Sequence, residues 1–302
     1  SCLLRLMRAM RIELPARVMN AWERMLRFSI AIMKPNGRVP MFGDSQDDQV
    51  WGYTWALKDF YDFPEYRWMQ SEGKEGRPPE FTSVALPSIG YYVMRSGWER
   101  DGCWLCFDGG RFGQAHHHED KLSFELVAYG RPFIVDAGVH SYSDHWFRQW
   151  AVLSAAHNVV LVDGAGQCRW RQDRDRWFSR LPLGNPWQTG GEWDVVEADF
   201  DGPWEWDVGR VRVRRRICFY RRAPMLWWLT DWCEGEGEHE VRELFHLAHD
   251  IERLDALDGG VRTRIEGGPD LALICLSGGV ELERHRGEQP AAGRAPRGWT
   301  SP

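Results

Sequence analysis

The first part of the chain carries apolar residues at helical spacing. Between positions 19 and 33 they recur at intervals of three and four, which is the buried stripe of an amphipathic helix. These residues are Met19, Trp22, Leu26, Ile30 and Met33. The tripeptide Pro-Asn-Gly at 35–37 predicts the end of this helix. An aromatic-rich stretch at 50–70 predicts further helix as far as Pro64, so the chain begins with an α-helical part.

The pattern changes after a polar segment rich in Gly, Pro and Glu at 71–80. Short runs of Val, Ile, Phe, Tyr and Trp then alternate with Gly, Asp, Asn and Pro, which predicts β-strands. The runs lie at 90–95, 103–108, 122–136, 157–164, 211–220, 224–232 and 271–276. Without alternating helices, they favour a large antiparallel β-sandwich or barrel over a parallel sheet. We therefore predict a mainly β fold with an N-terminal α part, divided into residues 1–75 and 80–302.

Composition and charge narrow the possible partners. The 302 residues include 38 Lys and Arg against 44 Asp and Glu, a formal net charge of -6. No basic stripe is present to bind phosphates, so nucleic acid is not expected as a partner. No apolar run approaches the roughly 20 residues that a membrane-spanning helix needs. The chain starts at Ser1 in what resembles the middle of a helix, and we expect a fragment whose upstream part is missing.

A run of three histidines at 116–118 is the densest group of candidate metal ligands. The candidate donors in and around it are His116, His117, His118, Asp120, Asp136 and His157. Zinc is commonly held by His and Asp, with one position open or filled by water. Alternate residues of an extended segment share a face. His116, His118 and Asp120 therefore point one way, and His117 and Glu119 point the other.

Strand pairing alone does not complete a metal site. If Tyr129-Gly130 is the turn of a hairpin, the residue that faces Asp136 lies near Ser123, several positions from His118. The histidine run would have to fold back as a loop to reach Asp136. The alternatives are a solvated histidine loop, a turn role for Asp136, and a strand-capping role for His157.

Several ordered motifs around this run resemble the heparinase II/III-like polysaccharide lyases. The first is His116-x-His118-x-Asp120-x-Leu122-Ser123-Phe124, followed by Val135-Asp136-x-Gly138. Further along the chain come Tyr142, Arg148, Ala156-His157-Asn158 and Val162-Asp163-Gly164-x-x-Gln167. The likeness extends backward, more weakly, to the segment 35–48, and it fades after about residue 170.

The resemblance implies a fold, a substrate class and a metal. The β-sandwich would follow the last helices of an (α/α) toroid, and the substrate would be a uronic-acid polysaccharide. A zinc ion in a supporting role would be held by His118, Asp136 and His157, with His116 lining the active cleft. The resemblance also implies a location in the periplasm or cell envelope. Family members carry a catalytic Tyr and an Asn or His upstream in the toroid, so we expect only part of the active site here.

Eliminative cleavage limits the roles that these residues can take. Removal of the C5 proton and departure of the C4 oxygen require a base, an acid and a group that neutralises the carboxylate. His116 is the candidate neutraliser or proton carrier. Tyr142 is a candidate acid or cleft wall, or a packing aromatic. Arg148 pairs either with a substrate carboxylate or with a structural acid, and Asp120 is expected to orient a ligating histidine.

Three functions are open on these grounds. The leading one is a polysaccharide lyase acting by β-elimination on an acidic polysaccharide. The second is a non-catalytic carbohydrate-binding or exopolysaccharide-assembly module in which zinc only stabilises the fold. The third is a zinc-dependent hydrolase, in which metal-bound water attacks the substrate. It ranks last because the nearest additional carboxylate, Glu119, points to the other face. The sequence does not determine the oligomeric state.

Overall fold

The computed structural model describes residues 6–7, 9–48, 50, 63–113, 115–139, 141–143, 146–171 and 182–286. Its helices are α2 (Ala16–Ile32), α4 (Pro64–Gln70) and α5 (Trp146–Ala151), with short 3-10 helices η2 (Ser154–Ala156) and η3 (Arg169–Arg171). The first strands are β1 (Val84–Leu86), β2 (Tyr91–Arg95), β3 (Trp104–Asp108), β4 (Phe124–Ala128), β5 (Arg131–Ile134), β6 (Val160–Val162) and β7 (Trp187–Gly190). The later strands are β8 (Trp193–Phe200), β9 (Arg212–Tyr220), β10 (Leu226–Glu234), β11 (Val241–Glu243), β12 (Arg253–Leu257), β13 (Gly260–Arg264) and β14 (Ala272–Ile274). Within these residues, no helix combines the length and the apolar character needed to cross a membrane.

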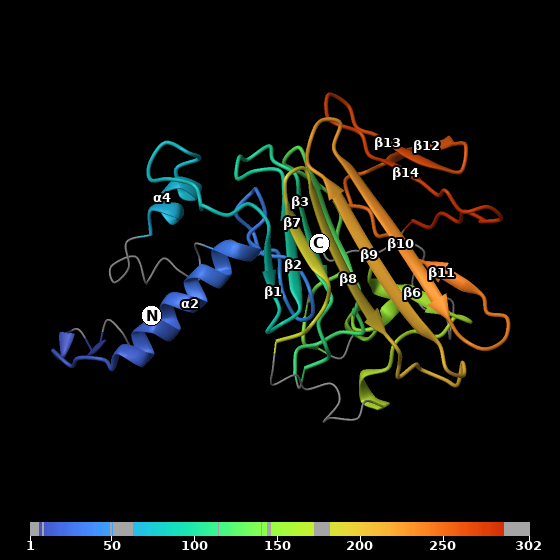
Figure 1. Ribbon diagram of the computed structural model, residues 1–302, viewed down its shortest axis with the longest axis horizontal. Helices are drawn as coiled ribbons and strands as arrows, with labels where there is room; N and C mark the ends of the chain where they lie inside the picture. The colour runs from blue at the N-terminus through green and yellow to red at the C-terminus, as the bar shows by residue number, and fades with distance from the viewer. Residues whose placement is uncertain are drawn as a thin grey trace.

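Two antiparallel sheets pack face to face as a β-sandwich (Figure 1). One sheet has the strand order β1-β2-β3-β4-β5 and the other has the order β10-β9-β8-β7. Apolar side chains from both sheets share one core, in which Leu105 and Phe107 meet Val196 and Phe219. The predicted mainly β fold with an N-terminal α part is therefore confirmed.

The five-stranded sheet is buried on both faces. Alternate residues of a strand point to opposite sides, so Leu105 and Phe107 of β3 enter the core between the sheets. Trp104 and Cys106 of the same strand pack instead with Ile32 from the N-terminal part. Both faces of β3 and β4 are thereby covered, and every residue of these strands is buried.

The N-terminal helices follow the sequence prediction in one case and depart from it in another. Helix α2 ends at Ile32, before Pro-Asn-Gly, and its stripe buries Leu26 and Ile30. Helix α4 begins at Pro64 rather than ending there, because proline is well tolerated in a first helical turn, where its missing N–H has no partner to lose. The helix predicted over 51–62 lies outside the described residues.

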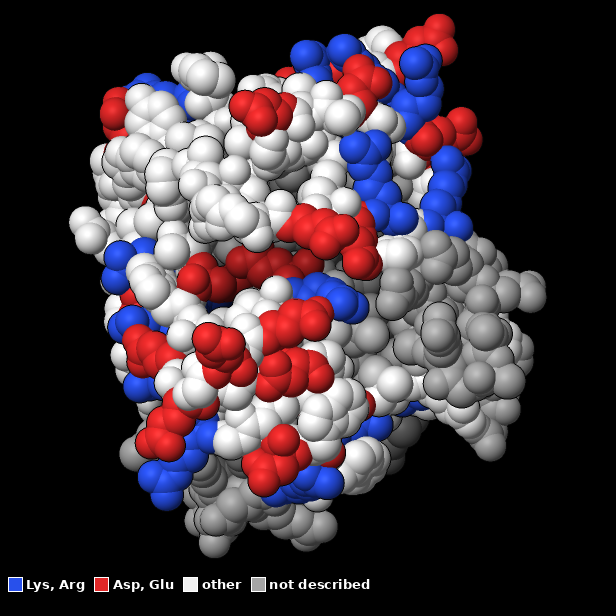
Figure 2. Space-filling view, turned by 90° about the vertical axis from the view of Figure 1, so that its right-hand side faces the viewer, with Lys and Arg blue, Asp and Glu red and all other residues white. Residues whose placement is uncertain are grey.

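Two smaller sheets complete the fold. Strands β11 and β6 form a pair, and β12, β13 and β14 form a three-stranded sheet that lies at the upper right of Figure 1. Figure 2 views the molecule from its right-hand side. On that face basic and acidic side chains are intermixed, and several acidic side chains lie in a hollow near its centre.

Candidate functional site

Three buried side chains meet in one cluster. His118 comes from the loop between β3 and β4, Asp136 follows β5, and His157 follows η2. One ligand atom of each residue lies within 4.8 Å of those of the other two, and all three side chains are buried. The structure thus brings together the three residues that the family resemblance implies for a metal site.

The hairpin of β4 and β5 positions Asp136. Its two-residue turn, Tyr129-Gly130, has φ values of 51° and 75°, as the common hairpin turn requires. The hydroxyl of Ser123 lies 3.4 Å from Oδ2 of Asp136, which is the neighbourhood predicted from the hairpin register. The Gly138 N–H donates to Oδ1 of Asp136 at 3.1 Å.

The histidine loop folds back onto the sandwich, as the metal hypothesis required. The Leu122 N–H donates to the carbonyl of Asp108 at 2.8 Å, and the Glu119 N–H donates to the carbonyl of Val152 at 2.9 Å. His116 and Leu122 both adopt positive φ, 61° and 70°, which breaks the extended path between them. These bonds deliver His118 to Asp136, which strand pairing alone could not do.

Helix α5 supports the other side of the cluster. Phe147, Trp150 and Ala151 of this helix pack with Ala137 and Ala156 in a small apolar core. This core fixes the segments that carry Asp136 and His157. Arg148, between Phe147 and Trp150 in sequence, keeps a side chain that is 22% exposed.

Two ring nitrogens in the cluster are available for an ion. Among the described residues, Nδ1 of His118 and Nε2 of His157 are buried without a hydrogen-bond partner. Nδ1 of His157 lies 2.8 Å from Oδ2 of Asp136, so these two candidate donors lie close enough to face one ion. Unpaired buried nitrogens are costly. Two imidazoles and a carboxylate fit zinc, so the residues present suit the implied metal.

The pKa values of the two histidines shift in opposite directions. Burial and the neighbouring His157 lower the pKa of His118 to about 4, so His118 is neutral, as a ligand must be. Burial also acts to lower the pKa of His157, but the Asp136 carboxylate outweighs it and raises that pKa above its usual value.

A second, exposed group lies next to the metal cluster. The His116 side chain is 69% exposed and Tyr142 is 66% exposed. The Tyr142 hydroxyl lies 3.4 Å from Nδ1 of His116, and the Arg148 guanidinium carbon lies 5.4 Å from the centre of the Tyr142 ring. The structure therefore gathers an imidazole, a phenol and a guanidinium, which were named separately from the sequence.

Asp44 joins the two groups, and the sequence analysis did not identify it. Its Oδ2 lies 2.9 Å from Nδ1 of His116 and its Oδ1 lies 2.9 Å from Nε2 of His118. Arg148 donates to Oδ1 as well. Burial acts to raise the pKa of Asp44, but the bonds from Arg148, His118 and His116 lower it to about 2. The one signal in the sequence is the Gly43-Asp44 pair, which lies within the weaker part of the family likeness.

Asp120 and Glu119 have other partners. Oδ2 of Asp120 accepts the Gly43 N–H at 3.2 Å, and Oδ1 lies 3.1 Å from the Lys121 ammonium. The charge of Asp120 acts to raise the pKa of both His118 and His157. The carboxylate that contacts Nε2 of His118, however, belongs to Asp44. Oε1 of Glu119 accepts the Arg169 N–H at 3.2 Å. The orienting role predicted for Asp120 stays a prediction.

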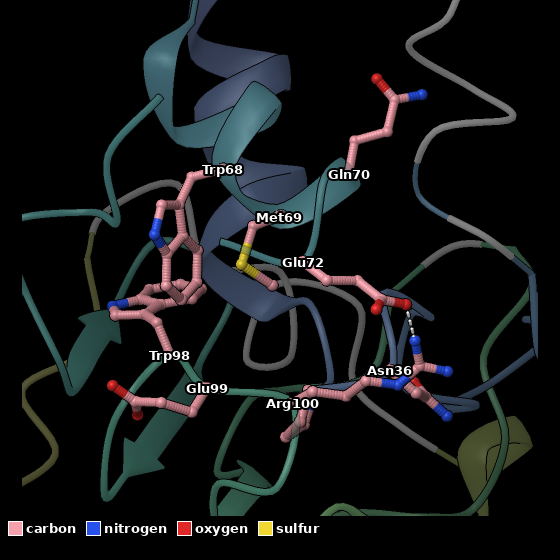
Figure 3. A pocket seen from close by; sticks show the side chains of 9 residues that line it. Asn36, Trp68, Met69, Gln70, Glu72, Trp98, Glu99 and Arg100 are labelled. Atoms are coloured by element: carbon pink, nitrogen blue, oxygen red, sulfur yellow. Dashed lines mark hydrogen bonds and ion pairs between the residues drawn. The ribbon is translucent and has the colours of Figure 1, made fainter. Parts of the chain in front are cut away.

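A separate hollow lies between α4 and the turn that joins β2 to β3 (Figure 3). Trp68 and Met69 line it from α4, and Trp98 lines it from the turn. Glu72 and Arg100 form an ion pair at its edge. Its volume of about 180 Å³ is below the roughly 300–1,000 Å³ of ordinary ligand pockets. None of the residues named for the histidine cluster lines it.

Comparison with protein families matches residues 78–302 to a family described as heparinase II/III-like, C-terminal. The match extends well beyond residue 170, where the ordered motifs fade. A heparin-sulfate lyase of Pedobacter heparinus is 28% identical over 196 residues, which cover 61% of this chain and 28% of that protein. A heparin-sulfate lyase of Bacteroides thetaiotaomicron is 29% identical over 145 residues, which cover 41% of this chain and 21% of that protein.

Solved structures resemble the chain in fold. The heparan sulfate lyase HepC from Pedobacter heparinus matches with a TM-score of 0.73 and 24% identity, over 87% of this chain and 40% of that chain. A crystal structure of heparinase III matches with a TM-score of 0.68 and 20% identity, over 85% of this chain and 41% of that chain. The chain thus spans less than half the length of these proteins.

Proposed function

The chain belongs to the heparinase II/III-like family, and from this premise we propose that it is part of a polysaccharide lyase. The proposed substrate is an acidic, uronate-containing polysaccharide, and the proposed reaction is β-elimination. The similar curated proteins are heparin-sulfate lyases, which supports this substrate class. Because the chain covers a minor part of their length, the activity belongs to the whole protein.

The exposed group of His116, Tyr142 and Arg148 is the observation that carries this proposal. Elimination develops negative charge on a uronate carboxylate while a proton leaves C5 and the C4 oxygen departs. An exposed imidazole beside a phenol can neutralise that charge or carry a proton. One nitrogen of Arg148 donates to the Asp44 carboxylate, which favours pairing with a structural acid over pairing with a substrate carboxylate. Any contact with substrate would use its other nitrogens.

We assign the metal to zinc, held by His118, Asp136 and His157. A bound zinc ion would supply a fixed positive charge and would hold the histidine loop in place. The substrate itself would be met by the chain's own residues. His116 would contact it from the same loop, and Asp44, from the segment after α2, would hold His116 by the contact to its Nδ1. The complete burial of the three ligands favours this supporting role over hydrolysis, which needs an open coordination position for water.

The test of the lyase proposal uses the complete protein with its upstream region. It is incubated with a panel of uronate polysaccharides, and the absorbance of the unsaturated uronate product is followed. We expect a rise on at least one substrate, and a rate at least about 100-fold lower in His116→Ala, the lower range for loss of a general acid–base group. His249→Ala, an exposed histidine outside the site, is the matched control and should keep the wild-type rate.

A different outcome would support the second function. Absence of the absorbance rise on every substrate, together with retained polysaccharide binding, would replace the lyase by a non-catalytic binding module. The buried metal cluster would then act only in stabilising the fold. The burial of all three ligands fits such a structural metal as well as it fits the supporting metal of a lyase.

Elemental analysis tests the metal assignment independently of activity. Purified His118→Ala and Asp136→Ala should each lose most of the stoichiometric zinc, because each removes one of three donors. His116→Ala should retain the zinc, since this residue contributes no ligand atom to the cluster. Stoichiometric zinc in both ligand variants would contradict the assignment.

A further inference from the structure

One buried carboxylate, Asp44, contacts a histidine of each of the two groups described above. Its side chain is 4% exposed, and its two oxygens are divided between the two rings. Oδ2 lies 2.9 Å from Nδ1 of His116, and Oδ1 lies 2.9 Å from Nε2 of His118. The two histidines are 72 and 74 positions further along the chain.

Hydrogen-bond chemistry determines which nitrogen of His118 carries the proton. A neutral imidazole has one N–H and one acceptor nitrogen. Nδ1 of His118 has no partner among the described residues, so it is the ring nitrogen left to face an ion, and a ligand nitrogen needs its lone pair available. Nε2 therefore carries the hydrogen. Arg148 also lies 3.1 Å from Nε2, but a guanidinium cannot accept a hydrogen bond, which leaves Asp44 as the acceptor.

The same reasoning applies to His116 with the nitrogens exchanged. The carboxylate of Asp44 only accepts hydrogen bonds, so Nδ1 of His116 is the donor. The acceptor lone pair then lies on Nε2, the nitrogen that a substrate can reach on this exposed ring. One carboxylate thus selects opposite tautomers in two histidines of the same loop.

The backbone holds Asp44 in this position. The Asp44 N–H donates to the carbonyl of His116 at 3.0 Å. The preceding residue, Gly43, has φ +58°, and a Cβ at this position would lie 2.4 Å from the same carbonyl oxygen. The close approach of Gly43 to His116 therefore requires glycine. Both the backbone and the side chain of Asp44 are fixed against the histidine loop.

We propose that Asp44 is a positioning residue that sets the ring tautomers of His116 and His118 together and thereby couples the metal site to the exposed imidazole. The coupling acts in both directions, because the hydrogen bond from either His116 or His118 holds the Asp44 carboxylate in the orientation that the other ring needs. Only the consequence for turnover rests on the proposed lyase function. The tautomers and the metal affinity do not depend on that function.

The test compares Asp44→Asn with the wild type and with Asp47→Asn in the complete protein. Asparagine has nearly the same shape, but its amide offers one acceptor oxygen and a donor NH₂, so it cannot accept from both histidines. Asp47 lies in the same segment and pairs with Lys34 and Arg38 instead, which makes it the matched control. The measurements are ring ¹⁵N chemical shifts of labelled histidines, and zinc affinity by competition with a chromophoric chelator.

We expect wild-type His116 to carry its hydrogen on Nδ1 and zinc-bound His118 to carry its hydrogen on Nε2. In Asp44→Asn, the His116 ring should become a mixture of tautomers, and zinc affinity should fall about 10–100-fold, the usual effect of removing such an orienting partner. If the complete protein is active, kcat should fall in the same variant with little change in KM. Asp47→Asn should match the wild type in every measurement.

Two results would overturn the proposal. One is wild-type His116 with its hydrogen on Nε2, which requires no variant and so does not depend on whether Asp44→Asn folds. The other is an Asp44→Asn protein with unchanged tautomers and unchanged zinc affinity. Failure of the lyase proposal looks different, because the polysaccharide panel would then give no product in the wild type while the tautomers stay as described.

Discussion

At the scale of single residues, the histidine run divides among three environments. The side chain of His116 is 69% exposed and that of His118 is fully buried. His117 is half-buried, and burial together with the Lys121 charge lowers its pKa to about 4. Neighbours in sequence thus differ in exposure, because the loop turns at His116 and exposes one ring while it buries another.

The pKa of His246 leads to a pH prediction at this scale. Burial and repulsion from His157 lower this pKa to about 4, against 6.5 for an unperturbed histidine. The folded state therefore keeps His246 neutral while the unfolded state takes up a proton, so stability is complete above pH 6.5 and is lost as pH falls toward 4. Between pH 7 and pH 5 the loss from this residue is about 2 kcal/mol.

His246→Gln should remove that part of the acid sensitivity. Nε2 of His246 donates to the Ala155 carbonyl at 3.1 Å, and the glutamine amide can donate to the same oxygen without titrating. Urea unfolding of the metal-free proteins at pH 7 and pH 5 measures the effect. If the wild type and His246→Gln lose the same unfolding free energy between pH 7 and pH 5, His246 is not the source of this acid sensitivity.

At the scale of elements, a buried ion pair attaches the segment just after α2 to β4. The Lys34 ammonium lies 2.6 Å from Oε2 of Glu125, and their side chains are 4% and 1% exposed. The Met41 N–H also donates to Oε1 of Glu125. The buried Glu125 carboxylate has no water to replace Lys34, whereas the Lys34 ammonium also lies 3.6 Å from Oδ1 of Asp47.

Lys34→Met should therefore destabilise the protein by about 3–5 kcal/mol, the cost of leaving one buried charge unpaired. The double variant Lys34→Met with Glu125→Gln should recover much of that loss, since glutamine is neutral and still accepts the Met41 N–H. Chemical denaturation of both variants and of Glu125→Gln alone gives the coupling. Equal stability of the single and double variants would show that the pair is not coupled.

At the scale of the whole molecule, the N-terminal part covers one face of the sandwich. Ile32 and Phe42 pack on Val93, Trp104 and Cys106 of the five-stranded sheet. The same part supplies Asp44 to the histidine loop. The sandwich is thus incomplete without it, both in its core and in its candidate site.

Residues 78–302 produced alone should therefore expose an apolar sheet face. We expect a lower melting temperature, binding of a hydrophobic dye and weaker zinc binding than in the 302-residue chain. A shorter deletion of residues 1–13 is the control, because Leu6, Met10 and Ile12 are 56%, 59% and 45% exposed. A dye-free, equally stable fragment would favour the division into residues 1–75 and 80–302, which stays a prediction.

The sequence by itself determined the features that depend on near neighbours. The apolar stripe of α2, the apolar runs that form β2–β5, the Tyr129-Gly130 turn and the proximity of Ser123 to Asp136 all follow from local sequence pattern and turn chemistry. The family motifs added the residues His118, Asp136 and His157. The sequence did not predict strands with mixed charged and apolar residues, such as β7 and β8. The β-propensity of such a segment depends on how its side chains pack against the opposite sheet, which the sequence does not show.

Only the tertiary structure decided which distant residues meet. Strand pairing placed His118 away from Asp136, and backbone bonds from the loop to Asp108 and Val152 brought it back. Asp44 lies 72 positions before His116, a separation over which no periodicity relates two side chains. Asp44 and His116 meet because the segment after α2 packs on the five-stranded sheet, on the face away from the other sheet. The loop between β3 and β4 of that same sheet carries the histidines. Local pattern fixes the elements, and the packing of those elements fixes the site.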